Sequence, residues 1–175
     1  KMGWWCSDTA ELGYADVRVP AGNLVGPENS GFIQIMQQFQ VERAFIAVQC
    51  YATAQRCLDL TLQWVKKRET FGRALSTRQV IRHKVVDMAT AVDVARTYTR
   101  AAVDRIVAGD TDVRMVSMAK NAAVAACNLA VDTAVQLHGG MGYLRETEVE
   151  RHYRDSRILG IGGGTTEIMK EIIAK

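Results

Sequence analysis

The stretch MQQFQVERAFIAVQCYATAQRCLDLTLQWV, residues 36–65, decides the fold, because its core-type positions recur every three or four residues. Such spacing places side chains on one face of an α-helix and is typical of an amphipathic helix packed on a core. The pattern predicts one long helix from about Glu28 to about Val65. Its seam consists of Met36, Phe39, Arg43, Ile46, Cys50, Thr53, Cys57, Leu60 and Trp64.

Two further stretches have the same periodicity. One extends from near Thr77 to Ile106, and the other carries an alanine-rich seam over residues 116–137 that allows a neighbouring helix to approach closely. Shorter helices are expected over about residues 146–159 and 166–174. Since short loops join these segments, the sequence predicts a mainly α protein, an antiparallel up-and-down four-helix bundle.

The first 28 residues have a different character, and both prolines, Pro20 and Pro27, lie among them. The segment GYADVRVP, residues 13–20, alternates apolar with polar or small residues, which predicts a β-strand. We therefore expect a strand-and-loop remnant over residues 1–28 and a helical domain over residues 29–175. The abrupt start KMGWWCSDTAEL indicates a chain cut from a longer protein.

Composition narrows the possible functions. The 175 residues are 48% hydrophobic and 23% charged, as in an ordinary globular domain, and a net charge of +3 is too small to argue for nucleic-acid binding. No apolar run reaches about 18 residues, so neither a membrane span nor a signal peptide is expected. The four cysteines form no CxxC pair, which favours a reduced, intracellular protein, and the histidines have no metal-ligand spacing.

The segment from Lys66 to Lys84 contains seven basic residues and one acid. This cluster is explained equally well by a solvated helix end and by a specific anion-binding site. Glycine-rich turns occur at residues 69–75, 138–143 and 160–167, and none matches a dinucleotide or P-loop fingerprint. The last turn has three consecutive glycines, whereas a helix C-cap needs one. Backbone N–H groups that no side chain shields, at the start of a helix, form a binding site for an anion or a carbonyl oxygen.

Glu42 lies beside the apolar seam, next to Arg43. Taken alone, the residues favour an ordinary helical acid that faces solvent. A carboxylate against an apolar wall is also suited to act as a general base.

Four segments occur in a diagnostic order: ERAFIA at 42–47, KRETFGRALSTRQVIRHKVVDMAT at 67–90, QLHGGMGYLRETEVERHYRDSRI at 136–158 and GGGTTEIMKEIIA at 162–174. Together they resemble the C-terminal half of an acyl-CoA dehydrogenase. Residues 1–20 resemble the end of the middle β-domain of that family, so the resemblance covers essentially the whole chain.

The resemblance implies an FAD-dependent α,β-dehydrogenation of an acyl-CoA thioester to trans-2-enoyl-CoA. In that family a glutamate removes the α-proton, and the β-hydrogen leaves as hydride to the flavin. The electrons then pass to a partner, usually electron-transfer flavoprotein. The helical domain of the family assembles subunits, so a homo-oligomer, either a dimer or a tetramer, is expected.

The resemblance also assigns residues to the site. Arg43 and the backbone N–H of Gly163 would bind substrate, the latter at the thioester carbonyl. Eight positions would bind FAD: Arg68, Phe71, Gln79, Gln136, Gly139, Gly140, Thr165 and Glu167. Arg68, Phe71 and Gln79 would reach the FAD of a neighbouring subunit. Gln136, Gly139 and Gly140 would bring backbone close to the same FAD. Thr165 and Glu167 would contact its adenosine end.

One position departs from the commonest family pattern. Many members read Tyr-Glu-Gly-Thr where this chain has Gly162 to Thr165, so their catalytic glutamate coincides with Gly163. The isovaleryl-CoA and long-chain branches carry the acid in an ER pair on the long helix, which corresponds to Glu42 here. Glu42 is therefore the expected base. The missing side chains are expected to leave room for a branched, bulky or long acyl group, and Gln40 replaces an aspartate common near CoA.

Several alternatives stay open at this point. An acyl-CoA oxidase-like relative would pass electrons to oxygen, and a catalytically inactive helical module would only assemble or bind a partner. The acyl chain length is not determined by these residues. The resemblance implies the bacterial cytoplasm or the mitochondrial matrix, and the 175-residue chain alone is expected to bind FAD poorly and to turn over no substrate.

Overall fold

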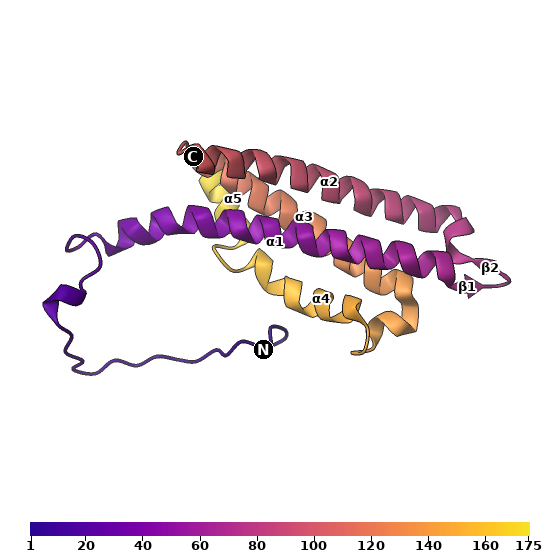
Figure 1. Ribbon diagram of the computed structural model, residues 1–175, viewed down its shortest axis with the longest axis horizontal. Helices are drawn as coiled ribbons and strands as arrows, with labels where there is room; N and C mark the ends of the chain where they lie inside the picture. The colour runs from indigo at the N-terminus through magenta and orange to yellow at the C-terminus, as the bar shows by residue number, and fades with distance from the viewer.

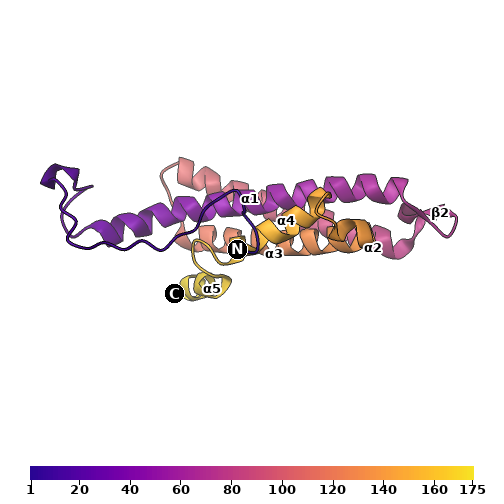
Figure 2. The ribbon, with the colours of Figure 1, turned by 90° about the horizontal axis from the view of Figure 1, so that it is seen from below.

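The computed structural model describes all 175 residues, and most of them are helical. The five α-helices are α1 (Gly31–Lys67), α2 (Gln79–Val107), α3 (Val113–His138), α4 (Glu148–Ser156) and α5 (Thr166–Ala174). Two short strands, β1 (Glu69–Thr70) and β2 (Arg73–Ala74), link α1 to α2. Figure 1 shows α1, α2 and α3 as long antiparallel rods, and Figure 2 shows α4 lying along α1 and α3 with α5 to one side. The predicted mainly helical bundle is confirmed, with helix ends within a few residues of those expected.

The contact between α1 and α3 is built from small side chains. On α1 the line of fully buried residues is Ala47, Cys50, Ala54 and Cys57. On α3 the matching line is Ala123, Cys127, Ala130 and Ala134. Small side chains let two helix backbones approach closely, as ridges into grooves. The seam is rotated from the predicted one, since Ile46 and Thr53 are only half-buried while the alanines beside them are enclosed.

Helix α3 is the centre of the bundle, because it packs against α1, α2, α4 and α5. Side chains are therefore buried on several of its faces, including every residue of the seam predicted for it. Helix α2 buries Met88, Val92, Ala95, Thr99 and Ala102, as its periodicity predicts. The apolar period of these two helices thus identified their buried faces correctly.

A β-hairpin, which the sequence analysis did not predict, connects α1 to α2. Thr70 pairs with Arg73, and the two turn residues Phe71 and Gly72 have positive φ angles of 52° and 75°. Two consecutive positive φ angles are typical of a type I′ turn, whose twist suits a hairpin. Strands of two residues are too short to produce an alternating pattern, so only the glycine-rich turn at residues 69–75 was visible in the sequence.

The strand predicted over residues 13–20 is absent, and this segment is exposed and unpaired. A strand is stabilised by hydrogen bonds to a neighbouring strand, and none lies beside it in this chain. Figure 1 shows the segment running along one side of the bundle before it returns to α1.

The first five residues nevertheless contact α4. The backbone N–H of Trp4 donates to Asp155 Oδ1 at 2.7 Å, and the guanidinium of Arg154 lies 3.9 Å from the ring centre of Trp5. A Cβ on Gly3 would lie 2.7 Å from the carbonyl oxygen of Arg154, so this approach requires glycine. The N-terminal segment is therefore attached to the bundle at α4.

A charged cluster fastens α4 to α1. Arg56 donates from Nε and from an Nη to the two carboxylate oxygens of Glu148, both at 2.8 Å, and His152 Nε2 lies 3.0 Å from the same carboxylate. The hydrogen bonds from Arg56 lower the pKa of Glu148 to about 2. The ionised carboxylate is thus favoured by the fold.

We predict that Glu148→Gln lowers the melting temperature at pH 7 by about 2–4 °C. The pKa of Glu148 is lower in the folded protein than its ordinary value of 4.5, so the stabilisation is fully present above that value. It is lost as the pH falls through the folded pKa of about 2. Thermal melts of both proteins should therefore converge between pH 4.5 and 2, and a difference that is constant with pH would contradict this account.

The small-residue contact makes a second prediction. Ala130→Leu adds side-chain volume where α1 and α3 are closest, and overpacking of this kind costs about 1–3 kcal/mol. Ala125→Leu, on an exposed face of the same helix, should change the free energy of unfolding by less than about 0.5 kcal/mol. Urea unfolding of the two variants measures the difference, and equal stabilities would show that the contact has room to spare.

Candidate functional site

The glycine turn between α4 and α5, residues 160–165, has a backbone that only glycine adopts easily. Gly163 and Gly164 have φ angles of 65° and 100°, in the left-handed region. Thr165 ends the turn as the N-cap of α5, because its side-chain oxygen accepts a hydrogen bond from the backbone N–H of Ile168 at 3.3 Å. The consecutive glycines therefore follow from the backbone that leads into α5.

Two buried cations hold the carbonyl groups of this turn. Arg43 Nε, on α1, donates to the carbonyl oxygen of Gly163 at 2.9 Å, and Lys120 Nζ, on α3, donates to that of Gly164. Next to Lys120, Asn121 Nδ2 donates to the carbonyl oxygen of Thr166 at 3.1 Å. Side chains of two helices thus bind three carbonyl oxygens in and just after the turn.

Neither cation has a carboxylate within ion-pair distance, although Arg43 is 5% exposed and Lys120 is fully buried. Burial lowers the pKa of Arg43, and the charge of the adjacent Glu42 partly offsets this. Burial also lowers the pKa of Lys120, while the Cys50 thiol opposes that shift and the charge of Arg43 adds to it. The site therefore concentrates positive charge against backbone oxygens alone.

The last three N–H groups of the turn are free, whereas those of Ile161 and Gly162 bond to the carbonyl oxygen of Ile158. Those of Gly163, Gly164 and Thr165 donate no hydrogen bond to the backbone of the chain. A trans peptide directs its N–H opposite to its C=O, so the N–H groups of Gly164 and Thr165 point away from Arg43 and Lys120. The turn thus presents unpaired donors on the side opposite its buried cations, and it can receive an oxygen there.

Glu42 lies next to the contact between α1 and the glycine turn, which Arg43 and Ile46 make. The side chain of Glu42 is half-buried and takes part in no ion pair. Ile46 follows it by four residues, on the same side of the helix. A Cβ on Gly163 would lie 2.8 Å from Ile46 Cδ1 and 3.8 Å from Arg43 Cγ. The fold therefore brings Glu42 and Arg43 to the same region as Gly163, around Ile46, although Arg43 and Gly163 are 120 residues apart in sequence.

The expectation that the glycines leave empty space is wrong at Gly163. The volume that its side chain would occupy is filled by Ile46, because the turn packs directly against α1. A Cβ on Gly162 would lie 3.6 Å from the carbonyl oxygen of Ile158, which is an ordinary contact. Any room gained is therefore at Gly162.

Three of the residues expected to bind FAD lie together at the hairpin end. A cavity of about 420 Å³ is lined by Arg68, Gly139 and Gly140 together with Trp64 and His138, whose rings stack with centres 4.9 Å apart. Side chains at either glycine would meet no atom within 4 Å, so bare backbone faces open space beside a cation. This donor set fits an anionic cofactor, and a diphosphate suits a guanidinium.

The other predicted cofactor residues lie in two places. Phe71, 97% exposed, is at the hairpin tip, with Gln79 at the start of α2 and Gln136 near the end of α3. Thr165 and Glu167 lie instead at the start of α5, which Figure 1 shows at the opposite end of the bundle. Lys120 and Gly139 are 19 residues apart along α3, which is about 28 Å at the helical rise. The predicted cofactor residues thus form two separate groups within one chain.

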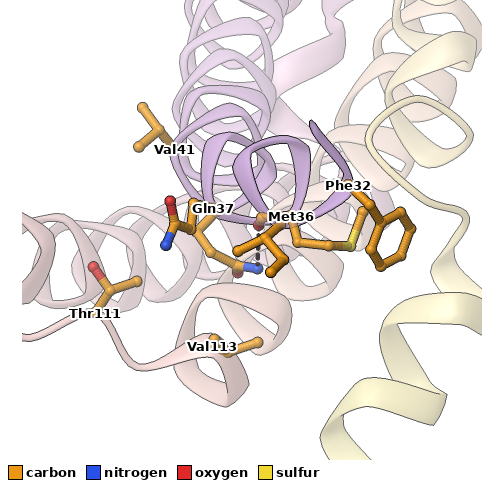
Figure 3. Close-up of a pocket in the computed structure, with 8 residues that line it drawn as sticks. Phe32, Met36, Gln37, Val41, Thr111 and Val113 are labelled. Atoms are coloured by element: carbon orange, nitrogen blue, oxygen red, sulfur yellow. Dashed lines mark hydrogen bonds between the residues drawn. The ribbon is translucent and has the colours of Figure 1, made fainter. Parts of the chain in front are cut away.

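A third feature is an apolar groove of about 440 Å³ between the first turns of α1 and the start of α3. Figure 3 shows Phe32, Met36, Gln37 and Val41 on α1 and Thr111 and Val113 across from them. Gln40 also lines the groove, and its Oε1 atom is buried without a partner. Residues two apart project about 200° apart on a helix, so Glu42 faces away from this groove. The groove and the glycine turn are therefore distinct features.

Lys120 is the residue that the sequence analysis missed. It follows Val116 by four residues and precedes Ala123 by three, so it occupies a seam position of α3. A lysine on an otherwise apolar helical face is a signal of a buried charge, but its acceptor, Gly164, is 44 residues away. The partner could only be found from the packing of α5 against α3.

Comparison with known proteins identifies the family to which this chain belongs. The family model of the acyl-CoA dehydrogenase C-terminal domain matches residues 29–175. The crystal structure of a probable acyl-CoA dehydrogenase from Mycobacterium abscessus covers 99% of this chain with a TM-score of 0.97 and 68% identity, over 46% of its own chain. The mitochondrial long-chain specific acyl-CoA dehydrogenase of Mus musculus is 38% identical over 100% of this chain and 41% of its own length. Subunit CarC of the caffeyl-CoA reductase-Etf complex of Acetobacterium woodii is 35% identical over 99% of this chain and 46% of its own.

The chain belongs to the acyl-CoA dehydrogenase family of flavoprotein oxidoreductases, as its motifs led us to expect. It spans less than half the length of these relatives. None of its helices combines the length and the apolar character needed to cross a membrane.

We predict that Gly163→Ala is more destabilising than Gly109→Ala. Both glycines have positive φ, 65° and 78°, but only the side chain at 163 would collide with a neighbour, Ile46. Backbone strain costs each variant about 1 kcal/mol, and the collision adds to it at 163. Combining Gly163→Ala with Ile46→Val tests the collision directly. Chemical unfolding of the three variants checks this, and equal losses for the two single variants would contradict the packing described.

Proposed function

We propose that the protein containing this chain catalyses FAD-dependent α,β-dehydrogenation of an acyl-CoA thioester, with Glu42 as the general base. The observation that carries the proposal is the position of the glycine turn against the helical turn of α1 that holds Glu42 and Arg43. Gly163 has no side chain, so the turn itself supplies no acid. Glu42 is a carboxylate close to this turn that takes part in no ion pair.

The geometry supports a division of labour between base and hydrogen-bond donor. Glu42 would accept the α-proton of the thioester. The free N–H of Gly163 would donate to the thioester oxygen, where negative charge develops as that proton leaves. Arg43 would hold the turn through the carbonyl of Gly163 and add positive charge beside the same region. Bound FAD supplies the acceptor for the β-hydride.

The two groups of cofactor residues favour an assembly of at least two subunits. Arg68, Gly139 and Gly140 surround a cavity at one end of the bundle, while Thr165 and Glu167 lie with the glycine turn at the other. A flavin bound beside the glycine turn of one subunit would be contacted by the hairpin end of another subunit. We therefore propose a homo-oligomer, a dimer or tetramer, and poor FAD binding by the 175-residue chain alone.

The proposal also includes the electron acceptor and the cellular compartment. One relative is a subunit of a caffeyl-CoA reductase-Etf complex, which supports electron-transfer flavoprotein as the partner. An oxidase-like relative is the second candidate, and it would form hydrogen peroxide with the same substrate. The mitochondrial and bacterial relatives support the mitochondrial matrix or the bacterial cytoplasm as its compartment.

We predict that Glu42→Gln in the full-length, flavin-loaded protein lowers turnover by about 10²–10⁴-fold, the usual contribution of a general base. Glutamine preserves the size of the side chain and removes its ability to accept the proton. Glu28→Gln, just before α1, is the matched control and should leave turnover unchanged.

The assay uses acyl-CoAs of different chain length and branching, with an artificial electron acceptor, with electron-transfer flavoprotein and with oxygen. The substrate panel reports the preferred acyl group, and the acceptor panel separates dehydrogenase from oxidase. Full activity of the Glu42→Gln variant would disprove the assignment of the base. A wild-type protein that is inactive with every acyl-CoA would disprove the proposed reaction.

A further inference from the structure

The buried ammonium of Lys120 is energetically unusual. A lysine is almost never fully buried unless it is paired, because removing a charge from water is costly. Lys120 is 0% exposed, lies on the alanine face of α3 and has no carboxylate within ion-pair distance. Its one hydrogen-bond acceptor in the chain is the carbonyl oxygen of Gly164. An apolar side chain would fill the same space at lower cost, so the charge requires another explanation.

The glycine turn needs to be held from outside. Consecutive glycines have the largest backbone freedom of any residues, and they carry no side chains that could pack and fix the turn. Within the chain, Gly162 N–H bonds back to Ile158, but the N–H groups of the next three residues make no backbone hydrogen bond. Hydrogen bonds from cations to carbonyl groups are stronger than neutral ones. They are therefore well suited to hold such a turn.

Lys120 and Arg43 act on adjacent peptide groups from two different helices. Arg43 on α1 binds the oxygen of Gly163, and Lys120 on α3 binds the oxygen of Gly164. Each peptide group is planar, so fixing both oxygens fixes the directions of two successive peptide planes. The torsion angles of Gly163 lie between the held planes and its own N–H. That N–H belongs to the Gly162–Gly163 peptide, which lies between the plane held by Arg43 and the plane fixed by the hydrogen bond from Gly162 N–H to Ile158 O, so contacts on both sides of it restrict its direction.

We propose that Lys120 is a positioning residue, which together with Arg43 holds the Gly163–Gly164 turn so that the Gly163 N–H meets the thioester oxygen of the acyl-CoA. Lys120 has no exposed surface, so it acts through the turn and does not touch substrate. This inference rests on the proposed function. It assigns a task to a charge that the reaction itself does not use.

The test is Lys120→Met in the full-length, flavin-loaded protein. Methionine is unbranched, apolar and close to lysine in length, so the fold should persist, and a thermal melt verifies this. We expect amide hydrogen exchange over residues 160–166 to accelerate at least about tenfold. In D₂O, exchange of the substrate α-proton should slow at least about tenfold, because small misplacements of a donor have large effects on rate. The dissociation constant for the acyl-CoA, measured by calorimetry, should change less than about threefold.

Two matched variants complete the experiment. Lys170→Met removes an exposed lysine from α5 and should change none of the three measurements. Lys120→Gln keeps a donor but removes the charge, and it should give values between those of wild type and Lys120→Met. If Lys120→Met fails to fold, the Lys120→Gln measurements decide the question by the same criteria.

The outcomes separate this inference from the proposed function. An active wild type whose folded Lys120 variants keep normal amide exchange over the turn, or normal α-proton exchange, would overturn the positioning role. A proportional loss of stability and acyl-CoA affinity, without a local change at residues 160–166, would also overturn it, since that is the result of a purely structural lysine. A wild type that neither exchanges the α-proton nor turns over any acyl-CoA would refute the proposed function itself.

Discussion

The close approach of α1 and α3 is the contact on which the rest of the structure depends. Alanine and cysteine side chains line both helices along this contact, so the backbones lie near each other and α3 becomes the central element. Helices α2, α4 and α5 then pack on the remaining faces of α3. Because α1 and α3 are close, one side chain from each, Arg43 and Lys120, can bind neighbouring carbonyls of the same turn.

The glycine turn presents two kinds of backbone group on opposite sides. Its carbonyl oxygens face buried cations, and its N–H groups are left for an external oxygen. Positive φ at Gly163 and Gly164, together with the close packing of Ile46, accounts for the absence of side chains there. The turn itself carries no charged side chain. Arg43 on α1 and Lys120 on α3 supply positive charge on its buried side.

The length of α3 has a consequence for assembly. Gly139 and Gly140 follow its C-terminal end, whereas the glycine turn before α5 packs near Lys120, about 28 Å away by helical rise. In the proposed oligomer, an antiparallel neighbour would place the hairpin end of one subunit beside the glycine turn of the other. The rigid rod that gives the domain its core therefore also favours a shared site between subunits.

Regular features were predictable from sequence because they repeat. Helical periodicity identified α1, α2 and α3 and the buried faces of α2 and α3, whereas on α1 only Arg43, Cys50 and Cys57 of the predicted seam are buried. The order of four motifs identified the family. The sequence also indicated Glu42 and the glycine turn as related positions. Their roles stay proposals, but their proximity to Ile46 is a property of the fold.

Features that depend on a distant partner were decided only by tertiary structure. The expected strand near Tyr14 has no neighbouring strand to pair with, and the two-residue strands of the hairpin are too short to show a pattern. Sequence could not reveal that Ile46 fills the space beside Gly163 or that Lys120 binds Gly164, because both contacts join segments far apart in the chain. Local periodicity determined which segments are helical and which faces of α2 and α3 are buried, whereas the packing of α5 and its preceding turn against α1 and α3 determined which buried charges meet which backbone groups.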